Sequence, residues 1–282
     1  MLIFRLSGGL GNQFFSFAAG YRFCREKGEV FGLDVSTQCA DWFFRDFDLA
    51  NYDIRYDKEV LYRLGDNRMD HYLWNHVNRR KEIGLFTPTI RERKLYQYDP
   101  ELFQFSKHHV YVIGDWQSWK YFLPVEKEIR KMYQYQNELS SDASRWKELI
   151  DHTNSVAVHI RRGDYVDLNI TIDPQYYVNA LAFAAEQLQD PVFYCFSEDT
   201  AWVRNAFKDL PYHFEYMEYD SSKKGLEDFE LMRSCKHQIV CDSTYSWWAA
   251  YLNDNTDKLV VHPLVKKKGQ DFWPLDWNEI EF

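Results

Sequence analysis

The sequence has little glycine, proline and cysteine, and these shortages exclude several classes of protein. Its 282 residues include 12 Gly and 8 Pro, too few for a fibrous or low-complexity chain. The 5 Cys are odd in number and lack metal-ligand spacing, and the 9 His are not paired, so the sequence shows neither a disulfide framework nor a zinc signature. We therefore expect reduced thiols in a globular fold, and no metal.

Excess positive charge and long apolar runs are also missing. The formal net charge is -9, which argues against a surface for nucleic acid, because phosphate backbones are held by extended basic faces. No window reaches the roughly 18 apolar residues of a membrane span. The first residues, Met1–Leu6, run directly into glycines and lack the apolar core of a signal peptide. We expect a soluble cytoplasmic protein without a membrane span, and peripheral association with the inner face of the membrane stays open.

The composition that remains, 45% hydrophobic and 27% charged, supports one large domain or two modest ones. The second half shows short apolar strands separated by amphipathic stretches of helical length. The expected strands are Val156–Ile160, Val192–Phe196, His213–Met217, Gln238–Cys241 and Leu259–His262, and the expected helices are Pro174–Gln187, Asp199–Phe207, Leu226–Cys235 and Thr244–Leu252. This alternation predicts an α/β class with a parallel, doubly wound sheet, in which ligands bind beyond the carboxyl ends of the strands.

The first half opens in the same way and then loses its pattern. The expected elements are a strand at Leu2–Leu6, a turn at Ser7–Gln13, a helix from Phe14 to about Lys27, strands at Val30–Val35 and Val110–Ile113, and a helix at Trp119–Gln136. Residues 40–110 indicate short helices and loops, and Ser140–Ser144 a polar linker. We expect two domains, residues 1–150 and 151–282, with the boundary near residue 150.

The sharpest motif is His159–Tyr165, which contains Arg161, Arg162 and Asp164 where a buried strand ends. A guanidinium offers a planar fork of donors that matches phosphate oxygens and keeps its charge. Arg161 and Arg162 therefore suit a diphosphate and would stabilise the charge of a departing group. The alternative is a surface cluster of ion pairs.

Two further strand ends carry hydroxyl groups. Ser243, Thr244 and Ser246 open a helix, whose free amide groups and dipole form an anion site; the alternative is an ordinary N-cap followed by core tryptophans. Ser197 is followed by two carboxylates, which favours ribose or sugar hydroxyls over phosphate, and a plain helix cap is the alternative.

A glycine-rich segment, Gly8–Gln13, lies between the first strand and the first helix. Its spacing does not match the dinucleotide fingerprint and no P-loop lysine follows, so NAD and ATP are weak candidates. Asn12 and Gln13 offer amides for sugar hydroxyls, with a structural turn as the alternative. Aromatic residues make up 18% of the chain. Most belong to the core, and Trp42, Trp74, Trp116 and Trp119 are candidates for an acceptor groove.

Taken together and in order, five blocks resemble the bacterial α-1,2-fucosyltransferases of glycosyltransferase family 11. They are Gly8–Gln13, His159–Tyr165, Phe196–Asp199, Asp228–Met232 and Ser243–Trp248, with Cys235-Lys236-His237 before the last. The likeness runs from residue 1 to about 252. The sequence departs from the common pattern at Asp242, where Asn is usual, and at Phe14–Phe17, which loosens any inference about the acceptor.

The resemblance implies a GT-B-like architecture of two Rossmann-type domains, with the C-terminal domain binding the GDP-sugar and the N-terminal domain shaping the acceptor site. It implies that Arg161 contacts the pyrophosphate, that His159 lies beside the nucleotide and that Asp228 recognises guanine. Arg162 is a second contact or a structural partner, and Ser197, Ser243, Thr244 and Ser246 complete the donor site. Gly9, Gly11, Asn12 and Gln13 form a loop at the acceptor and transferred sugar, with Asn12 close to the reacting hydroxyl.

These expectations describe an inverting transfer of L-fucose from GDP-β-L-fucose, a co-substrate, to the 2-hydroxyl of a terminal β-galactose. No cofactor is expected, and the lack of an Asp-x-Asp motif beside the predicted phosphate site predicts independence from metal ions. Asp164 is a candidate general base, or else a brace for an arginine. The alternatives are another GDP-sugar or linkage and, from another class, a glycan-binding module that binds oligosaccharide without turnover.

Overall fold

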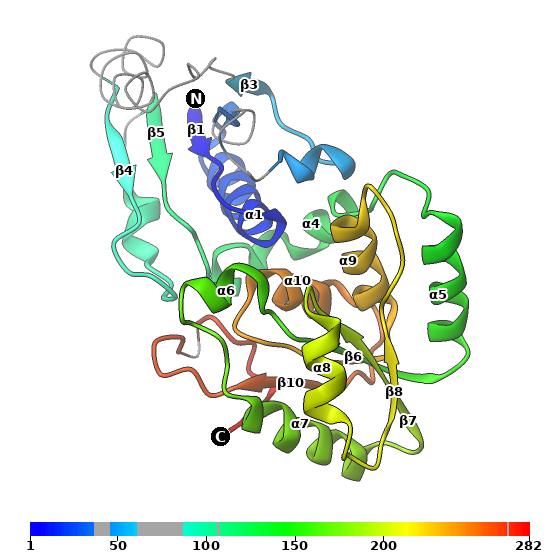
Figure 1. Ribbon diagram of the computed structural model, residues 1–282. Coiled ribbons are helices and arrows are strands. Elements are labelled where there is room, and N and C mark those ends of the chain that lie inside the picture. Colours follow the sequence, from blue (N-terminus) through cyan, green and yellow to red (C-terminus); the bar gives the residue numbers. More distant parts are fainter. Residues whose placement is uncertain (37–45, 61–86, 106–107, 270) are drawn as a thin grey trace. The chain divides into compact units, whose positions relative to one another are not determined.

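The computed structural model of the chain describes residues 1–36, 46–60, 87–105, 108–269 and 271–282 (Figure 1). These form two compact units, which are described separately. Unit 1 comprises Met1–Gln136 and Lys267–Pro274, and unit 2 comprises Asn137–Lys266 and Leu275–Phe282. Each unit is built on a parallel sheet, so the expected α/β class is confirmed.

Unit 2 contains a six-stranded sheet in the order β11-β10-β9-β6-β7-β8. Its strands are β6 (Asn154–His159), β7 (Pro191–Phe196), β8 (His213–Tyr216), β9 (His237–Ile239), β10 (Val260–Pro263) and β11 (Asn278–Ile280). Every pairing is parallel. Strands β6 to β10 confirm the predicted strands. Strand β11 was not predicted, because its three residues are mostly polar and carry no apolar run.

Helices cover both faces of this sheet, as expected of a doubly wound fold. They are α5 (Ser141–Asp151), α6 (Gly163–Asp167), α7 (Pro174–Gln187), α8 (Thr200–Phe207), α9 (Lys224–Ser234) and α10 (Thr244–Leu252). Val156 and Val158 of β6 share one buried cluster with residues of α7 and α8. Side chains alternate along a strand, and His159 accordingly meets Tyr245 of α10, with ring centroids 5.5 Å apart.

Helix α5 corrects the expectation of a polar linker at Ser140–Ser144. The Ser140 hydroxyl caps this helix by accepting from the Ala143 N–H at 3.3 Å. The Ser140 N–H and hydroxyl in turn donate to the buried Glu227 carboxylate of α9 at 2.7 and 3.0 Å. Because these bonds attach α5 to unit 2, the first part of unit 1 ends at Gln136 rather than near residue 150.

Unit 1 contains a five-stranded sheet in the order β3-β2-β1-β5-β4. Its strands are β1 (Leu2–Arg5), β2 (Phe31–Asp34), β3 (Lys58–Val60), β4 (Thr89–Arg91) and β5 (Val110–Ile113), with short helices at η1 (Asp48–Asn51) and η3 (Pro100–Gln104). Strands β1, β2 and β5 and the short helices were predicted. The expectation of only helices and loops between residues 40 and 110 was wrong for β3 and β4, three-residue strands too short to show a period.

Helix α1 (Leu10–Lys27) begins earlier than expected, with Gly9 as its N-cap. Gly11, Asn12 and Gln13 therefore lie in its first turn rather than in a loop before it. The helix ends at Gly28, which adopts a left-handed φ of 62°, a conformation that favours glycine.

The single helix expected at Trp119–Gln136 is replaced by shorter pieces, and that expectation was wrong. They are η4 (Trp119–Tyr121), η5 (Leu123–Val125) and α4 (Glu126–Met132). The first break falls at Phe122, two residues before Pro124, which has no N–H for a helical hydrogen bond.

A segment near the end of the chain, Lys267–Pro274, belongs to unit 1. The Asp271 carboxylate accepts from the Tyr98 N–H at 2.8 Å and from the Lys120 ammonium. The Phe272 ring lies 6.2 Å from that of Phe15 and 5.7 Å from that of Tyr96, centroid to centroid. These contacts place a distant part of the sequence in the core of unit 1.

The aromatic and cysteine predictions have mixed outcomes. Trp116 is fully buried, so its expected exposure was wrong, and Trp42 and Trp74 lie outside the described residues. Four of the cysteines are buried free thiols, as predicted: Cys24, Cys195, Cys235 and Cys241. Cys39 lies outside the described residues.

In the described part of the chain, no helix has the length and apolarity to span a membrane.

Candidate functional site

The candidate site of unit 2 lies where its sheet changes direction. From β6 the chain builds β7 and β8 on one side and then returns to place β9, β10 and β11 on the other. The segments that leave the carboxyl ends of β6 and β9 therefore diverge, and this is where parallel α/β sheets bind ligands. Arg161 and Arg162 follow β6, and Ser243 follows β9.

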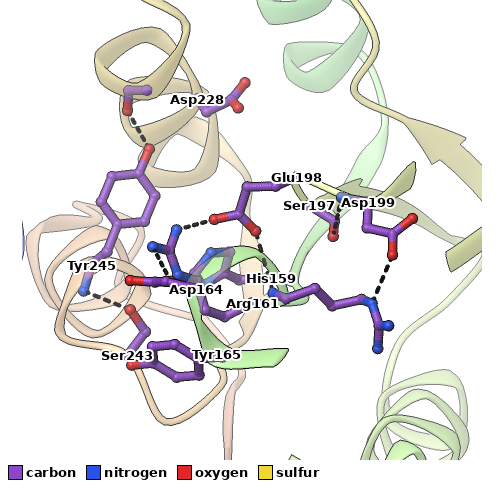
Figure 2. A network of polar contacts seen from close by, with 12 residues as sticks. His159, Arg161, Asp164, Tyr165, Ser197, Glu198, Asp199, Asp228, Ser243 and Tyr245 are labelled. Atoms are coloured by element: carbon purple, nitrogen blue, oxygen red, sulfur yellow. Dashed lines mark hydrogen bonds and ion pairs between the residues drawn. The ribbon is translucent and has the colours of Figure 1, made fainter. Parts of the chain in front are cut away.

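Arg161 is held between two carboxylates (Figure 2). Its Nη1 donates to Glu198 and its Nη2 donates to Asp164 Oδ1 at 2.7 Å. The Tyr165 ring lies 5.6 Å from the guanidinium carbon. The Arg161 side chain keeps 20% of its surface exposed, so a positioned cationic group remains accessible at the strand end.

Arg162 joins the end of β6 to the start of α8. Its Nε donates to Asp199 Oδ2 at 3.0 Å, and its guanidinium lies 3.9 Å from the centre of the Trp202 ring. Asp199 also caps α8 by accepting from the Trp202 N–H at 3.1 Å. The Trp202 N–H and then the Arg162 guanidinium lower the pKa of the Asp199 carboxyl. Of the two predicted roles of Arg162, the structure shows the structural partnership, and a donor contact stays a prediction.

The start of α10 is capped by Ser243, whose hydroxyl accepts from the Tyr245 N–H at 3.3 Å. Thr244 is half-buried at the first helical position. Ser246 is buried, and its hydroxyl contacts the Ser243 carbonyl at 3.5 Å and Cys241 Sγ at 3.8 Å. Ser246 thus lies beneath the turn, and the positive end of the α10 dipole at this terminus favours an anion.

His159 lies under this turn and is 4% exposed. Burial, with a smaller contribution from the Arg161 charge, lowers the pKa of His159 to about 3, so the imidazole is neutral at physiological pH. Its Nδ1 contacts Cys241 Sγ at 3.2 Å. The ring links the ends of β6 and β9, the two strands that define the site.

Asp228, on α9, is a half-buried carboxylate near Tyr245 (Figure 2). It accepts from Lys224 Nζ at 2.8 Å and from the Tyr219 hydroxyl at 2.9 Å. Burial raises the pKa of the Asp228 carboxyl, and the Lys224 charge opposes that shift. Ser197, on the other side of the site, accepts from the Asp199 N–H at 3.1 Å. The N-cap of α8 is Asp199, so the alternative reading of Ser197 as a plain helix cap was wrong.

Glu198 and Tyr245 were not among the predicted site residues. Glu198 binds the Arg161 side chain and also accepts from the Arg162 N–H at 3.3 Å. The register of the sheet pairs His159 with Phe196, so Arg161 and Glu198 each lie two residues beyond a paired position. The contact between Arg161 and Glu198 could have been predicted from the sequence if the pairing of β6 with β7 had been known.

The glycine-rich segment lies in unit 1, after β1. Gln13 is fully buried and uses its amide within the protein: it donates to the Gly8 carbonyl at 3.0 Å and the Asp46 carbonyl at 2.7 Å. Asn12 is half-buried, and its Oδ1 accepts from Gln117 Nε2 at 3.1 Å. Gly9 caps the helix and Gly11 is buried. Asn12 is therefore the more accessible of the two predicted amides.

No group of three or more His, Cys, Asp or Glu side chains suited to a metal ion occurs within the residues that the structure describes. Independence from metal ions stays a prediction for experiment.

Two parallel sheets, each with polar side chains at its strand ends, define a GT-B-like α/β protein, and known proteins share this fold. Fucosyltransferase NodZ from Bradyrhizobium aligns with a TM-score of 0.53 at 14% identity, over 88% of this chain and 91% of that chain. NodZ alpha-1,6-fucosyltransferase soaked with GDP-fucose gives 0.56 at 16% identity, over 89% and 91%. The expected GT-B-like class is thereby confirmed.

Sequence comparison gives the family. The family model described as Glycosyl transferase family 11 matches residues 85–281. An Alpha-1,2-colitosyltransferase of Escherichia coli is 26% identical over 93% of this chain and 91% of its own length. The O-antigen biosynthesis glycosyltransferase WbnK of Escherichia coli is 28% identical over 92% of each. The chain belongs to glycosyltransferase family 11, as its resemblance to the bacterial members indicated.

Proposed function

We propose that the protein is an inverting glycosyltransferase that moves L-fucose from GDP-β-L-fucose to the 2-hydroxyl of a terminal β-galactose of a glycan. The observation that carries the proposal is Arg161, at the switch point of unit 2, whose side chain is 20% exposed and lies near Ser243 and Tyr245 at the N-terminus of α10 (Figure 2). A guanidinium and a helix N-terminus are the groups that bind a diphosphate and stabilise its charge as it leaves.

Different residues of the site would bind different parts of the donor. Arg161 and the start of α10 would contact the pyrophosphate, with Ser243 and Thr244 adding hydroxyl groups. Asp228 would accept hydrogen bonds from guanine, which requires the base to compete with Lys224 for the carboxylate. His159, neutral and buried, would hold the two strand ends in place.

A second candidate donor is a GDP-activated colitose, because one relative that matches nearly the whole chain is named an Alpha-1,2-colitosyltransferase. Colitose is fucose without its 3-hydroxyl, so the same phosphate and guanine contacts serve both sugars. The names of that relative and of the galactoside 2-alpha-L-fucosyltransferases support the proposed 1,2-linkage.

The test is to incubate the purified protein with GDP-fucose, GDP-colitose or GDP-mannose and a panel of galactosides, and to determine the product linkage by NMR. We expect a 1,2-linked product from GDP-fucose, with the same rate after exhaustive chelation. Transfer from GDP-colitose but not from GDP-fucose would show that GDP-colitose is the donor. Oligosaccharide binding without turnover of any donor would indicate a glycan-binding module and refute the proposal. A cytoplasmic location stays a prediction.

A further inference from the structure

The carboxyl end of β6 carries two donors that both bind one carboxylate of the chain itself. Arg161 Nη1 donates to Glu198 Oε1, and the Arg162 backbone N–H donates to Glu198 Oε2 at 3.3 Å. Figure 2 shows Glu198 reaching from the segment after β7 to the Arg161 guanidinium. A guanidinium beside a backbone N–H is a combination that also suits phosphate oxygens. Glu198 therefore fills a position in which a phosphate could bind.

Glu198 and a phosphate cannot both use this position. A backbone N–H carries a single hydrogen, and that of Arg162 is directed to Glu198. Charge opposes joint occupation as well, because the ion pairs at the ends of β6 and β7 include more carboxylates than guanidiniums. Their members are Arg161, Arg162, Asp164, Glu198 and Asp199. A diphosphate adds further negative charge, so it binds more favourably when one carboxylate moves away.

Glu198 is the main counter-ion of Arg161. Burial acts to lower the pKa of the Arg161 guanidinium, but the charge of Glu198, followed by that of Asp164, raises it. Asp164 lies three residues after Arg161 and accepts from Nη2 at 2.7 Å, so it leaves Nη1 and the backbone N–H to Glu198. A phosphate in the place of Glu198 would supply the same negative charge to the half-buried guanidinium.

The Glu198 side chain can leave this position without disturbing a helix or strand. Glu198 lies between β7 and α8, and its side chain is 41% exposed. The residues on either side are fixed by bonds of their own. The Phe196 carbonyl accepts from the Ile160 N–H at 2.9 Å, and Asp199 caps α8. Rotation about the side-chain bonds of Glu198 is therefore enough to release the two donors.

We propose that Glu198 competes with the diphosphate of the donor for Arg161 and the Arg162 N–H, and thereby weakens the binding of GDP. This rests on the proposed function. As the diphosphate binds, its oxygens accept from the two donors and the Glu198 carboxylate turns to solvent. As GDP leaves, the carboxylate returns, which favours release of the product. If Glu198 were instead a brace that holds Arg161 in place for phosphate, its removal would weaken GDP binding.

The experiment compares Glu198→Gln with Glu218→Gln by calorimetric titration with GDP. Glu218 is the matched control, because it is exposed and pairs with another arginine of unit 2, Arg204, at 2.8 Å. Loss of an exposed ion pair changes an equilibrium constant by up to about fivefold, and repulsion between carboxylate and phosphate adds to this. We expect the Kd for GDP to be at least threefold lower in Glu198→Gln and unchanged in Glu218→Gln. A smaller decrease, no change or an increase in Glu198→Gln would overturn the proposal, as would an equal decrease in Glu218→Gln.

If Glu198→Gln does not fold, a crystal structure of the wild type with GDP gives the answer. The proposal requires phosphate oxygens within hydrogen-bond distance of Arg161 Nη1 and the Arg162 N–H, with Glu198 bound to neither. Glu198 still bound to either donor would overturn it.

Failure of the proposed function would be seen separately. A wild type that binds GDP but transfers no sugar would refute the proposed function, and the titration would still test Glu198. If the wild type does not bind GDP, inorganic pyrophosphate is the probe, with the same threefold criterion. Binding of pyrophosphate by neither the wild type nor Glu198→Gln would overturn the role of Glu198 as well.

Discussion

Replacing Arg161 by alanine removes the cationic group on which the proposed donor site depends. In the structure its two partners are Asp164 and Glu198, whose side chains remain 40% and 41% exposed. Ion pairs at such exposure contribute about 0–1 kcal/mol. The variant is therefore expected to fold, with a free energy of unfolding within about 1 kcal/mol of the wild type.

The effect on transfer should be much larger. Removing one positioned group that stabilises developing charge costs about 2.7–4 kcal/mol, or 10²–10³-fold in rate. We expect kcat/KM for GDP-fucose to fall by this factor in Arg161→Ala. Arg161→Lys should fall less, because an ammonium keeps the charge but loses the planar fork that matches phosphate oxygens.

The assay measures GDP release coupled to product formation, with the Kd for GDP from calorimetry and stability from urea unfolding. Arg145→Ala is the matched control, since Arg145 also pairs with an aspartate three residues away, Asp142 at 3.3 Å, on an exposed helix of the same unit. It should leave transfer and GDP binding unchanged. A folded Arg161→Ala protein with wild-type kcat/KM would refute the role of Arg161 in the donor site.

Three further predictions follow from other parts of the structure. In Asp164→Asn we expect less than about a fivefold loss of kcat/KM, because a half-exposed ion pair that braces an arginine is worth about 0.2–1 kcal/mol. Gly8→Ala should lower both the melting temperature and the transfer rate, since Gly8 has a φ of 72° and an added Cβ would lie 2.3 Å from Asn12 Nδ2. In His159→Asn we expect the free energy of unfolding to depend less on pH between about 6.5 and 4. The pKa of His159 is about 3 in the folded protein and about 6.5 in the unfolded chain, so only the unfolded chain binds the proton in this window. In the wild type each pH unit below about 6.5 therefore lowers the free energy of unfolding by about 1.4 kcal/mol, a contribution that the variant lacks.

Each of these has its own control. A 100-fold loss in Asp164→Asn, together with loss of the acid limb of the pH profile, would make Asp164 the general base after all. Gly28→Ala shares the left-handed backbone, with a φ of 62°, but its Cβ would meet nothing within 4 Å, so it should lose stability without losing activity. An unchanged slope of the free energy of unfolding against pH in His159→Asn would contradict a buried neutral imidazole.

Much of unit 2 was predictable because the signals are local. The apolar runs of β6 and β7 and the 14 residues of α7 carry their period within one short window. Arg161 was placed at a strand end by the same reasoning. Predictions failed where the local signal is weak, as in the three-residue strands β3 and β4, and where one proline, Pro124, divides an apparently helical stretch.

The sequence by itself determined the alternation of strands and helices, the strand-end position of Arg161 and the family to which the chain belongs. Only the tertiary structure decided which strand ends meet. The pairing of β6 with β7 brings Glu198 to Arg161, and the pairing of β1 with β5 brings Gln117 to Asn12. The physical reason is that strand order depends on packing between distant segments, whereas the period of a helix or strand is set by its own residues.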